Sequence, residues 1–200
     1  MDQAVASTAL IEYELDREDR ISWVNEAWSE FARDNEAQHL VDSVIGTPIW
    51  RWVAGEEVRQ LYQLLFSRVR NAGGTTRLPF RCDSPDLRRF MELDISSLPG
   101  DGLRCSAQLE RVEPRRPLWF LDPGAPRSEE LQWSEEVLGI CSCCKRVRVD
   151  EELWLEPEEA ASALRLLEDP PVAISHTICV DCAALFAEPI ARMPMRRRRR

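Results

Sequence analysis

The chain has 200 residues, of which 44% are hydrophobic and 30% are charged, and its formal net charge at pH 7 is −9. This length allows one ordinary domain and a second, small one, and the acidity argues against broad binding to a nucleic-acid backbone. The start Met1-Asp2-Gln3 lacks the basic and apolar regions of a signal peptide, and no run approaches the ~18 apolar residues of a membrane span. We therefore expect a cytoplasmic protein without a membrane-spanning helix.

Residues 11–112 predict a domain that opens with a β-hairpin and a helix. Apolar and acidic residues alternate at 11–15, a polar turn follows, and 21–24 predicts the second strand. Asn25 is placed to cap a helix that carries apolar side chains on one face. Residues 55–72 predict the best helix of this half, because apolar side chains recur there at three- and four-residue steps.

Three alternating runs at 76–82, 87–95 and 103–109 predict further strands. Short turns at 83–86 and 99–102 separate these runs, and consecutive strands with short turns pair antiparallel. The domain should therefore contain an antiparallel sheet of five strands, two from the hairpin and three from these runs.

The opening hairpin and first helix resemble those of the PAS family of sensory domains, and here they read Tyr13-Glu-Leu-Asp…Arg20-Ile-Ser-Trp-Val-Asn25-Glu-Ala-Trp28. Ile45-Gly46, the long helix and the three closing strands also match, so the resemblance covers residues 10–112. It implies an α+β fold in which helices cover one face of a five-stranded antiparallel sheet around a small pocket.

Cofactor-binding members of that family have features that are missing from this sequence. The flavin type resembles Asn-Cys-Arg-Phe-Leu around its reactive cysteine, and no such run occurs here. The single histidine of residues 11–112 is His39, which we interpret as a solvated loop residue rather than a haem ligand. Cys82 and Cys105 lie at alternating strand positions and are predicted to be core residues. We therefore expect neither haem nor flavin. Four tryptophans could line a pocket for a flat ligand or could simply pack in the core: Trp23, Trp28, Trp50 and Trp52.

Residues 113–136 predict a proline-rich linker followed by a short helix. Prolines interrupt regular structure in this segment, and the apolar run Leu118-Trp-Phe-Leu121 is expected to dock on a neighbouring surface. Ser128 is placed to cap a helix that carries Val137 and Leu138 toward the first cysteine.

Two C-x-x-C pairs dominate the C-terminal part of the sequence, and an insert with a helix start at Pro157 separates them. Each pair directs two sulfurs to one point, so two pairs predict a tetrahedral thiolate site for zinc, formed by Cys141, Cys144, Cys179 and Cys182. His176 and Cys143 are further candidates, as alternative ligands or as hydrogen-bond partners of a thiolate. The alternatives are buried apolar cysteines or a disulfide framework, which a chain without a secretory signal disfavours.

This segment also resembles a cysteine module at the end of bacterial PAS-containing signalling proteins, which reads I-C-x-x-C-K-x-I-R-x-D-x-x-x-W and then S-H-x-I-C-x-x-C. The resemblance implies that the four paired cysteines bind a metal, and it implies a less direct role for His176. The chain departs from the pattern at Cys143, which lies between Cys141 and Cys144. Cys182 begins a short helix that Pro189 is expected to stop, so one knuckle and one helix start predict a treble-clef-like module.

The sequence thus divides into an N-terminal tail (1–10), a PAS-like domain (11–112), a linker with a short helix (113–136), a zinc-binding module (137–188) and a basic disordered tail (189–200). No kinase, cyclase or phosphoacceptor motif and no Gly-rich phosphate loop occurs, which favours a non-enzymatic bacterial signalling protein that binds a protein partner, with a homodimer left open.

Two alternative functions stay open. In a thiol redox sensor, Cys143 would attack an oxidised neighbouring cysteine and release the metal. In a nucleic-acid-associated regulator, the five arginines Arg196–Arg200 would contact phosphates, although a solvated tail explains the same run.

Overall fold

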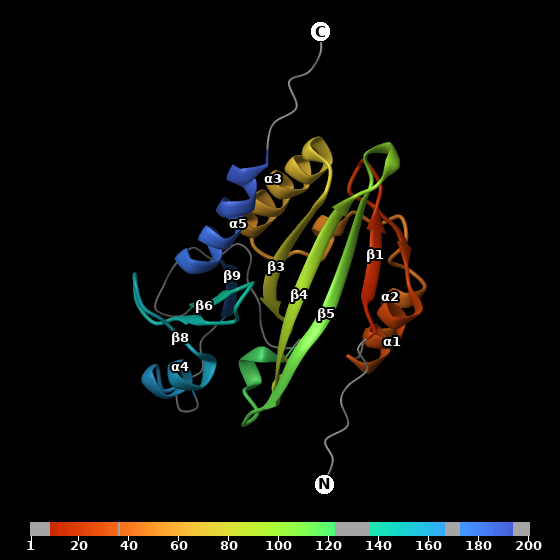
Figure 1. Ribbon diagram of the computed structural model, residues 1–200. Helices are drawn as coiled ribbons and strands as arrows, with labels where there is room; N and C mark the ends of the chain where they lie inside the picture. The colour runs from red at the N-terminus through yellow and green to blue at the C-terminus, as the bar shows by residue number, and fades with distance from the viewer. Residues whose placement is uncertain (1–8, 36, 123–136, 167–172, 194–200) are drawn as a thin grey trace.

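A computed structural model describes residues 9–35, 37–122, 137–166 and 173–193. Within these ranges the fold is α+β and contains one sheet of five strands and one of four (Figure 1). The five-stranded sheet is antiparallel, in the order β2-β1-β5-β4-β3, which confirms the predicted sheet. Its strands are β1 (Ile11–Leu15), β2 (Ile21–Val24), β3 (Thr75–Arg81), β4 (Leu87–Ser97) and β5 (Leu103–Pro114).

Helices follow the hairpin and then cover one face of this sheet. Asn25 caps the first helix by accepting from the Trp28 backbone N–H at 2.8 Å, and its side chain also bonds β1 through the Glu12 N–H at 3.1 Å. One cap residue therefore fixes both the start of the helix and its angle to the hairpin. The described helices before β3 are α1 (Glu26–Asp34), α2 (Gln38–Val41), the 3₁₀ turn η1 (Ile49–Arg51) and α3 (Glu56–Ala72).

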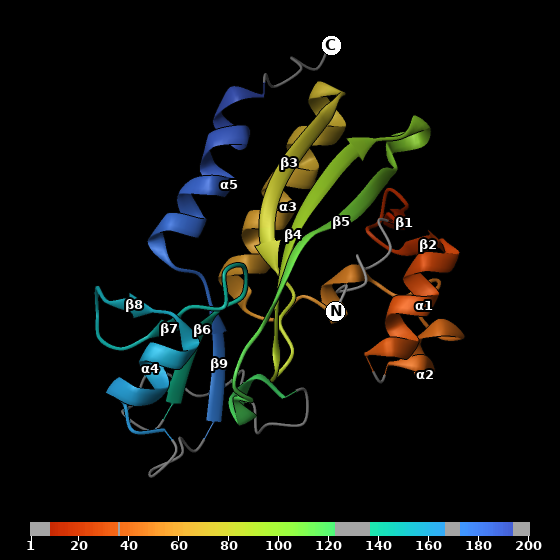
Figure 2. The same ribbon diagram turned by 60° about the horizontal axis from the view of Figure 1, so that its bottom comes forward.

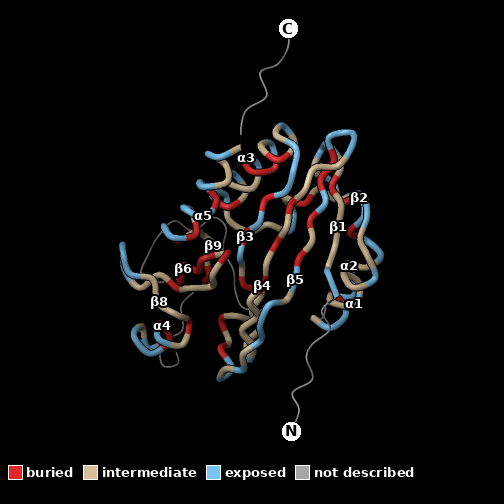
Figure 3. Tube along the Cα trace, in the orientation of Figure 1, coloured by how far each residue is buried: buried red, intermediate tan, exposed pale blue. Residues whose placement is uncertain are grey.

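The predicted long helix is confirmed as α3, and its apolar face packs on the sheet. Leu65, Phe66 and Val69 are buried from the helix, and Ile95 of β4 and Leu103 of β5 are buried from the sheet. Buried and exposed residues alternate along the strands, as expected for a sheet with one covered face (Figure 3). The short turns 3₁₀ η2 (Pro99–Asp101) and η3 (Trp119–Leu121) precede and follow β5.

The second sheet belongs to the cysteine module, our name for the described residues from 137 to 193. Its strand order is β8-β7-β6-β9, and β6 pairs with β9 in parallel, whereas β7 and β8 pair antiparallel. Its elements are β6 (Val137–Cys141), β7 (Val147–Arg148), β8 (Trp154–Leu155), α4 (Pro157–Ala163), β9 (Ala173–Thr177) and α5 (Val180–Arg192).

Two local predictions for this part of the chain are wrong. Val137 and Leu138 lie in the buried strand β6 rather than in a helix, because β9 supplies a parallel partner that the local pattern does not reveal. The helix after Cys182 continues through Pro189 to Arg192, so the predicted basic tail starts later than residue 189. Pro189 has no N–H to donate to the Leu185 carbonyl, yet the helix continues past it. The helix predicted after Ser128 and the arginine run lie outside the described residues.

One hydrophobic core connects the five-stranded sheet, α3 and the cysteine module. Tyr62 of α3 meets Phe186 of α5 edge to face, with ring centroids 4.9 Å apart, and helices α3 and α5 lie side by side (Figures 1 and 2). Leu118 and Phe120 are buried with Ile140 and Ile174 of the four-stranded sheet, so the predicted docking of this apolar run is confirmed. The module therefore packs on the sheet through an apolar interface.

A close backbone contact occurs at the start of α3. Gly55 has a φ of +89°, and a Cβ atom there would lie 2.6 Å from the carbonyl oxygen of His176 in β9. Only glycine combines this backbone conformation with this approach.

We expect Gly55→Ala to destabilise the protein by about 1–3 kcal/mol, because a methyl group would separate α3 from β9. Gly46→Ala is the matched control, since Gly46 has a similar φ of +80° but nothing within 4 Å of the added Cβ. Urea unfolding of both variants measures the difference, and equal losses would show that the contact with His176 contributes nothing.

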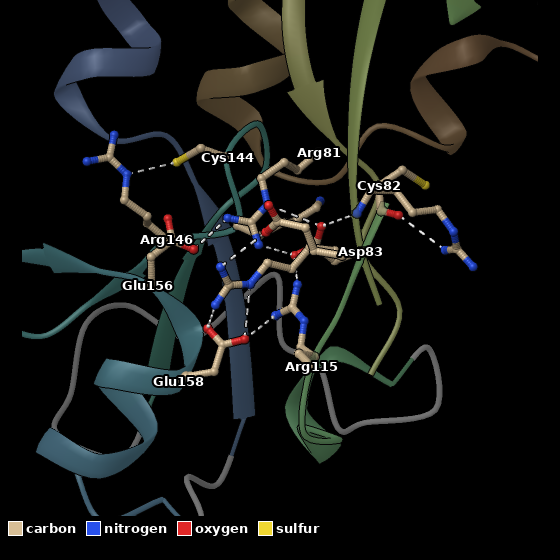
Figure 4. A network of polar contacts seen from close by, with 12 residues as sticks. Arg81, Cys82, Asp83, Arg115, Cys144, Arg146, Glu156 and Glu158 are labelled. Carbon is tan, nitrogen blue, oxygen red and sulfur yellow. Dashed lines mark hydrogen bonds and ion pairs between the residues drawn. The ribbon is translucent and has the colours of Figure 1, made fainter. Parts of the chain in front are cut away.

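A buried ionic network joins the turn after β3 to the start of α4 (Figure 4). The fully buried carboxylate of Asp83 pairs with the guanidinium groups of Arg81 and Arg115, which are also buried. Arg81 then reaches Glu156 with an Nη1–Oε2 distance of 2.6 Å, just before α4. The backbone N–H of Arg81 also donates to the Cys143 carbonyl at 2.7 Å, so this residue contacts the module at two points.

We expect Asp83→Asn to lower the free energy of unfolding by about 3–5 kcal/mol, because it leaves two buried guanidinium groups without their shared carboxylate. Asp86→Asn is the control, since Asp86 lies in the same turn and its carboxylate bonds only locally to Ser84. Thermal and urea unfolding measure both variants, and a loss no larger than that of the control would contradict the expectation.

Candidate metal centre

The Sγ atoms of Cys141, Cys144, Cys179 and Cys182 all lie within 4.8 Å of one another, and we call these four sulfurs the cysteine cluster. The Sγ atoms of Cys144 and Cys179 are 3.7 Å apart. A tetrahedral zinc with Zn–S bonds of about 2.3 Å requires sulfurs about 3.8 Å apart. All seven cysteines are free thiols, so this part of the chain is no disulfide framework. The cluster is therefore shaped to hold one metal ion.

The first two sulfurs come from the end of β6 and the tight turn behind it. Cys141 is the last residue of β6, and its carbonyl accepts from the Lys145 N–H at 3.0 Å while its own N–H donates to the Arg146 carbonyl at 2.8 Å. Lys145 adopts a φ of +63°, which closes the turn. These bonds direct Cys141 and Cys144 toward the same side.

The second two sulfurs come from the start of α5. Cys179 is the N-cap residue and Cys182 lies in the first turn, as predicted, where the helix N-terminus favours a thiolate. The parallel register of β6 and β9 sets Cys141 opposite Thr177, just two residues before Cys179. The Cys179 N–H then donates to Cys141 Sγ at 3.5 Å. Sheet register is thus what brings the two C-x-x-C pairs together.

Cys143 and His176 do not belong to this group of four among the described residues. Cys143 is buried beside the cluster, and its interaction with Cys141 raises the pKa of the Cys143 thiol above its ordinary value. His176 lies on β9 and lines a separate cavity of about 270 Å³ between α3 and the turn after β6, together with Tyr62 and Cys143.

The sequence patterns did not identify Arg146, which contacts the cluster, or Asp181, which contacts Arg146. Arg146 donates from Nε to Cys144 Sγ at 3.2 Å (Figure 4). It also donates from Nη2 to Cys179 Sγ at 3.4 Å. The same Nη2 bonds Asp181 Oδ2 at 2.7 Å. Contact with Cys144 raises the pKa of Arg146, which keeps the guanidinium charged. The sequence offered one indication of this contact, a basic residue two positions after the predicted ligand Cys144, but the cysteine motif allows any residue at that position.

The other residues considered from the sequence are divided between surface and core. His39 is exposed on α2, and Trp23 and Trp52 are 42% and 40% exposed. Burial raises the pKa of the Cys105 thiol to about 12, as expected for an inert core cysteine. Cys82 is half-buried against the same core, and burial raises its pKa as well.

The described helices include none that is long and apolar enough to cross a membrane. No protein-family model matches the chain. No curated protein matches it either.

Proposed function

We propose that this chain is a non-enzymatic protein of bacterial signal transduction, in which a PAS-like sensory or interaction domain is joined to a structural zinc module. The observation that supports it most strongly is the gathering of four thiol sulfurs within 4.8 Å from two C-x-x-C pairs. Four protein ligands complete a tetrahedral shell and leave no open position for a substrate, which favours a structural metal over a catalytic one.

Zinc is the proposed metal, because four thiolates suit it and because the module is small. A knuckle between β6 and β7 and a helix start at Cys179 resemble the treble-clef arrangement that the sequence suggested. Iron also accepts four thiolates, so metal analysis has to separate the two ions. When bound, the ion would neutralise part of the thiolate charge and cross-link β6 to α5.

The PAS-like assignment draws support from the larger sheet. The resemblance implies a five-stranded antiparallel sheet with helices on one face, and the described sheet has five antiparallel strands with α3 across one face. A ligand or partner that shifts α3 would also move β9 and α5, since Gly55 contacts His176 and Tyr62 contacts Phe186. We propose that the cysteine module transmits such a shift to a protein partner.

Metal content tests the zinc site directly. We expect one zinc per chain in fresh, reduced, untagged protein, and loss of that zinc when any of the four cluster cysteines is replaced by serine. A structural zinc contributes an apparent stabilisation of about 10–16 kcal/mol, so the module should lose its fold with the metal. Because Cys141 and Phe186 share a core with Phe66, the unfolding midpoint of the five-stranded sheet should fall as well.

Cys143→Ser is the matched control, because Cys143 lies beside the cluster without belonging to it, and it should keep both zinc and fold. Elemental analysis combined with thermal unfolding distinguishes these variants. A metal-free wild-type protein with a folded cysteine module would exclude the proposed site.

The PAS-like domain is expected to purify without a visible absorption band, because its histidine His39 is exposed and no flavin-binding cysteine motif occurs. An absorption spectrum is the measurement. A band that disappears in His39→Ala would indicate haem, whereas a band that disappears in Cys144→Ser would indicate iron in the cysteine cluster.

A thiol redox sensor is the second candidate, because Cys143 is a buried third thiol that packs in the same hydrophobic cluster as Cys141. A peroxide would oxidise Cys141 to a sulfenic acid, and attack by Cys143 would form a disulfide, release water and free the metal. Zinc content before and after peroxide treatment tests this function, with Cys143→Ser expected to abolish disulfide formation between the two residues.

A further inference from the structure

Arg146 bridges the two halves of the cysteine cluster. Its Nε donates to Cys144 Sγ at 3.2 Å, and its Nη2 donates to Cys179 Sγ at 3.4 Å. Cys144 belongs to the first C-x-x-C pair and Cys179 to the second, 35 positions further along the chain. One planar guanidinium group therefore holds sulfurs from two separate elements at a fixed spacing.

Arg146 is held in place through both its backbone and its side chain. The backbone carbonyl of Arg146 accepts from the Cys141 N–H at 2.8 Å, which fixes the residue beside the knuckle. Asp181 in the first turn of α5 accepts from Nη2 at 2.7 Å, which fixes the orientation of the side chain. A side chain with both ends anchored loses little further freedom when it bonds the sulfurs.

The charge of Arg146 and the exposure of Cys144 indicate what this contact would do at a metal site. Four thiolates around a divalent ion carry a net charge of −2, and Arg146 supplies a cation in direct contact with two of them. Cys144 is the one cluster cysteine that is only half-buried, so it is where a chelator or an electrophile can approach. The Arg146 side chain is 27% exposed and contacts this sulfur as well as Cys179 and Asp181.

We propose that Arg146 is a positioning residue for the metal: it holds Cys144 and Cys179 in ligand geometry and shields the accessible sulfur, and so slows loss of the ion. This inference rests on the proposed zinc site but concerns the lifetime of the bound metal rather than its presence. Lysine would keep the charge but would lose the parallel donors that reach two sulfurs at once.

The experiment uses the full chain loaded with one zinc and follows transfer of the metal to an excess of a chromogenic chelator. We expect Arg146→Gln to release zinc about tenfold faster or more, as is typical when a hydrogen-bond partner of a metal ligand is removed. Arg146→Lys should recover only part of the lifetime, and Asp181→Asn should accelerate release less than Arg146→Gln. Arg165→Gln is the control, because Arg165 is an exposed residue of the same module, and it should leave the rate unchanged.

Alkylation supplies a second readout that a general loss of stability would not mimic. With iodoacetamide and peptide mass mapping, Arg146→Gln should increase labelling at Cys144 selectively, while Cys105 in the sheet core stays unlabelled. Circular dichroism establishes that each variant is folded, and Arg146→Lys decides the question if Arg146→Gln does not fold.

Unchanged release and unchanged labelling of Cys144 in a variant that holds one zinc would overturn the role of Arg146 and leave the proposed function intact. A wild-type chain that binds no zinc would overturn both. Faster release together with selective labelling of Cys144 would support the proposal.

Discussion

The parallel pairing of β6 with β9 is the contact on which the cysteine cluster depends. The register sets Cys141, the last residue of β6, opposite Thr177, the last residue of β9. The two C-x-x-C pairs therefore lie at the same end of neighbouring strands. Every residue of β6 is buried, and such a strand satisfies its backbone groups only through partners on both sides. A slip of one residue would turn the β6 side chains to the opposite face and separate the sulfurs.

The cysteine module has a small apolar core of its own around Ile140 and Ile174, and it also packs against the larger sheet. Its second pair begins α5, and Phe186 of that helix packs against Tyr62 of α3. Arg81 adds a backbone bond to the Cys143 carbonyl and an ion pair to Glu156. A metal at the cluster would therefore stabilise an interface as well as a module, and a shift of α3 would reach the ligands through packed atoms.

Charged groups at Asp83 and at Arg146 are stabilised in the same way. Buried charge persists where an opposite charge and hydrogen bonds accompany it, as for Asp83 between two arginines. The same rule explains Arg146, because thiolate sulfurs close to one another repel and a shared guanidinium offsets that repulsion. In both cases arginine serves because its planar donors can reach two acceptors at once.

Features with local causes could be predicted from the sequence. The Asn25 cap, the apolar face of α3, the hairpin turns and the helix start at Pro157 follow from short-range rules, and all of them occur as predicted. The four cluster cysteines were also identified from spacing alone, since a C-x-x-C pair is a property of one turn.

Features that need a partner distant in sequence became visible in the folded protein. Val137 and Leu138 form a strand because β9 lies beside them, and that partner begins 36 residues later in the chain at Ala173. Arg146 contacts sulfur because α5 brings Cys179 and Asp181 to it, which no pattern around residue 146 encodes. Local periodicity is read from neighbours in sequence, whereas these contacts arise from burial and hydrogen bonding between segments that meet only in the folded protein.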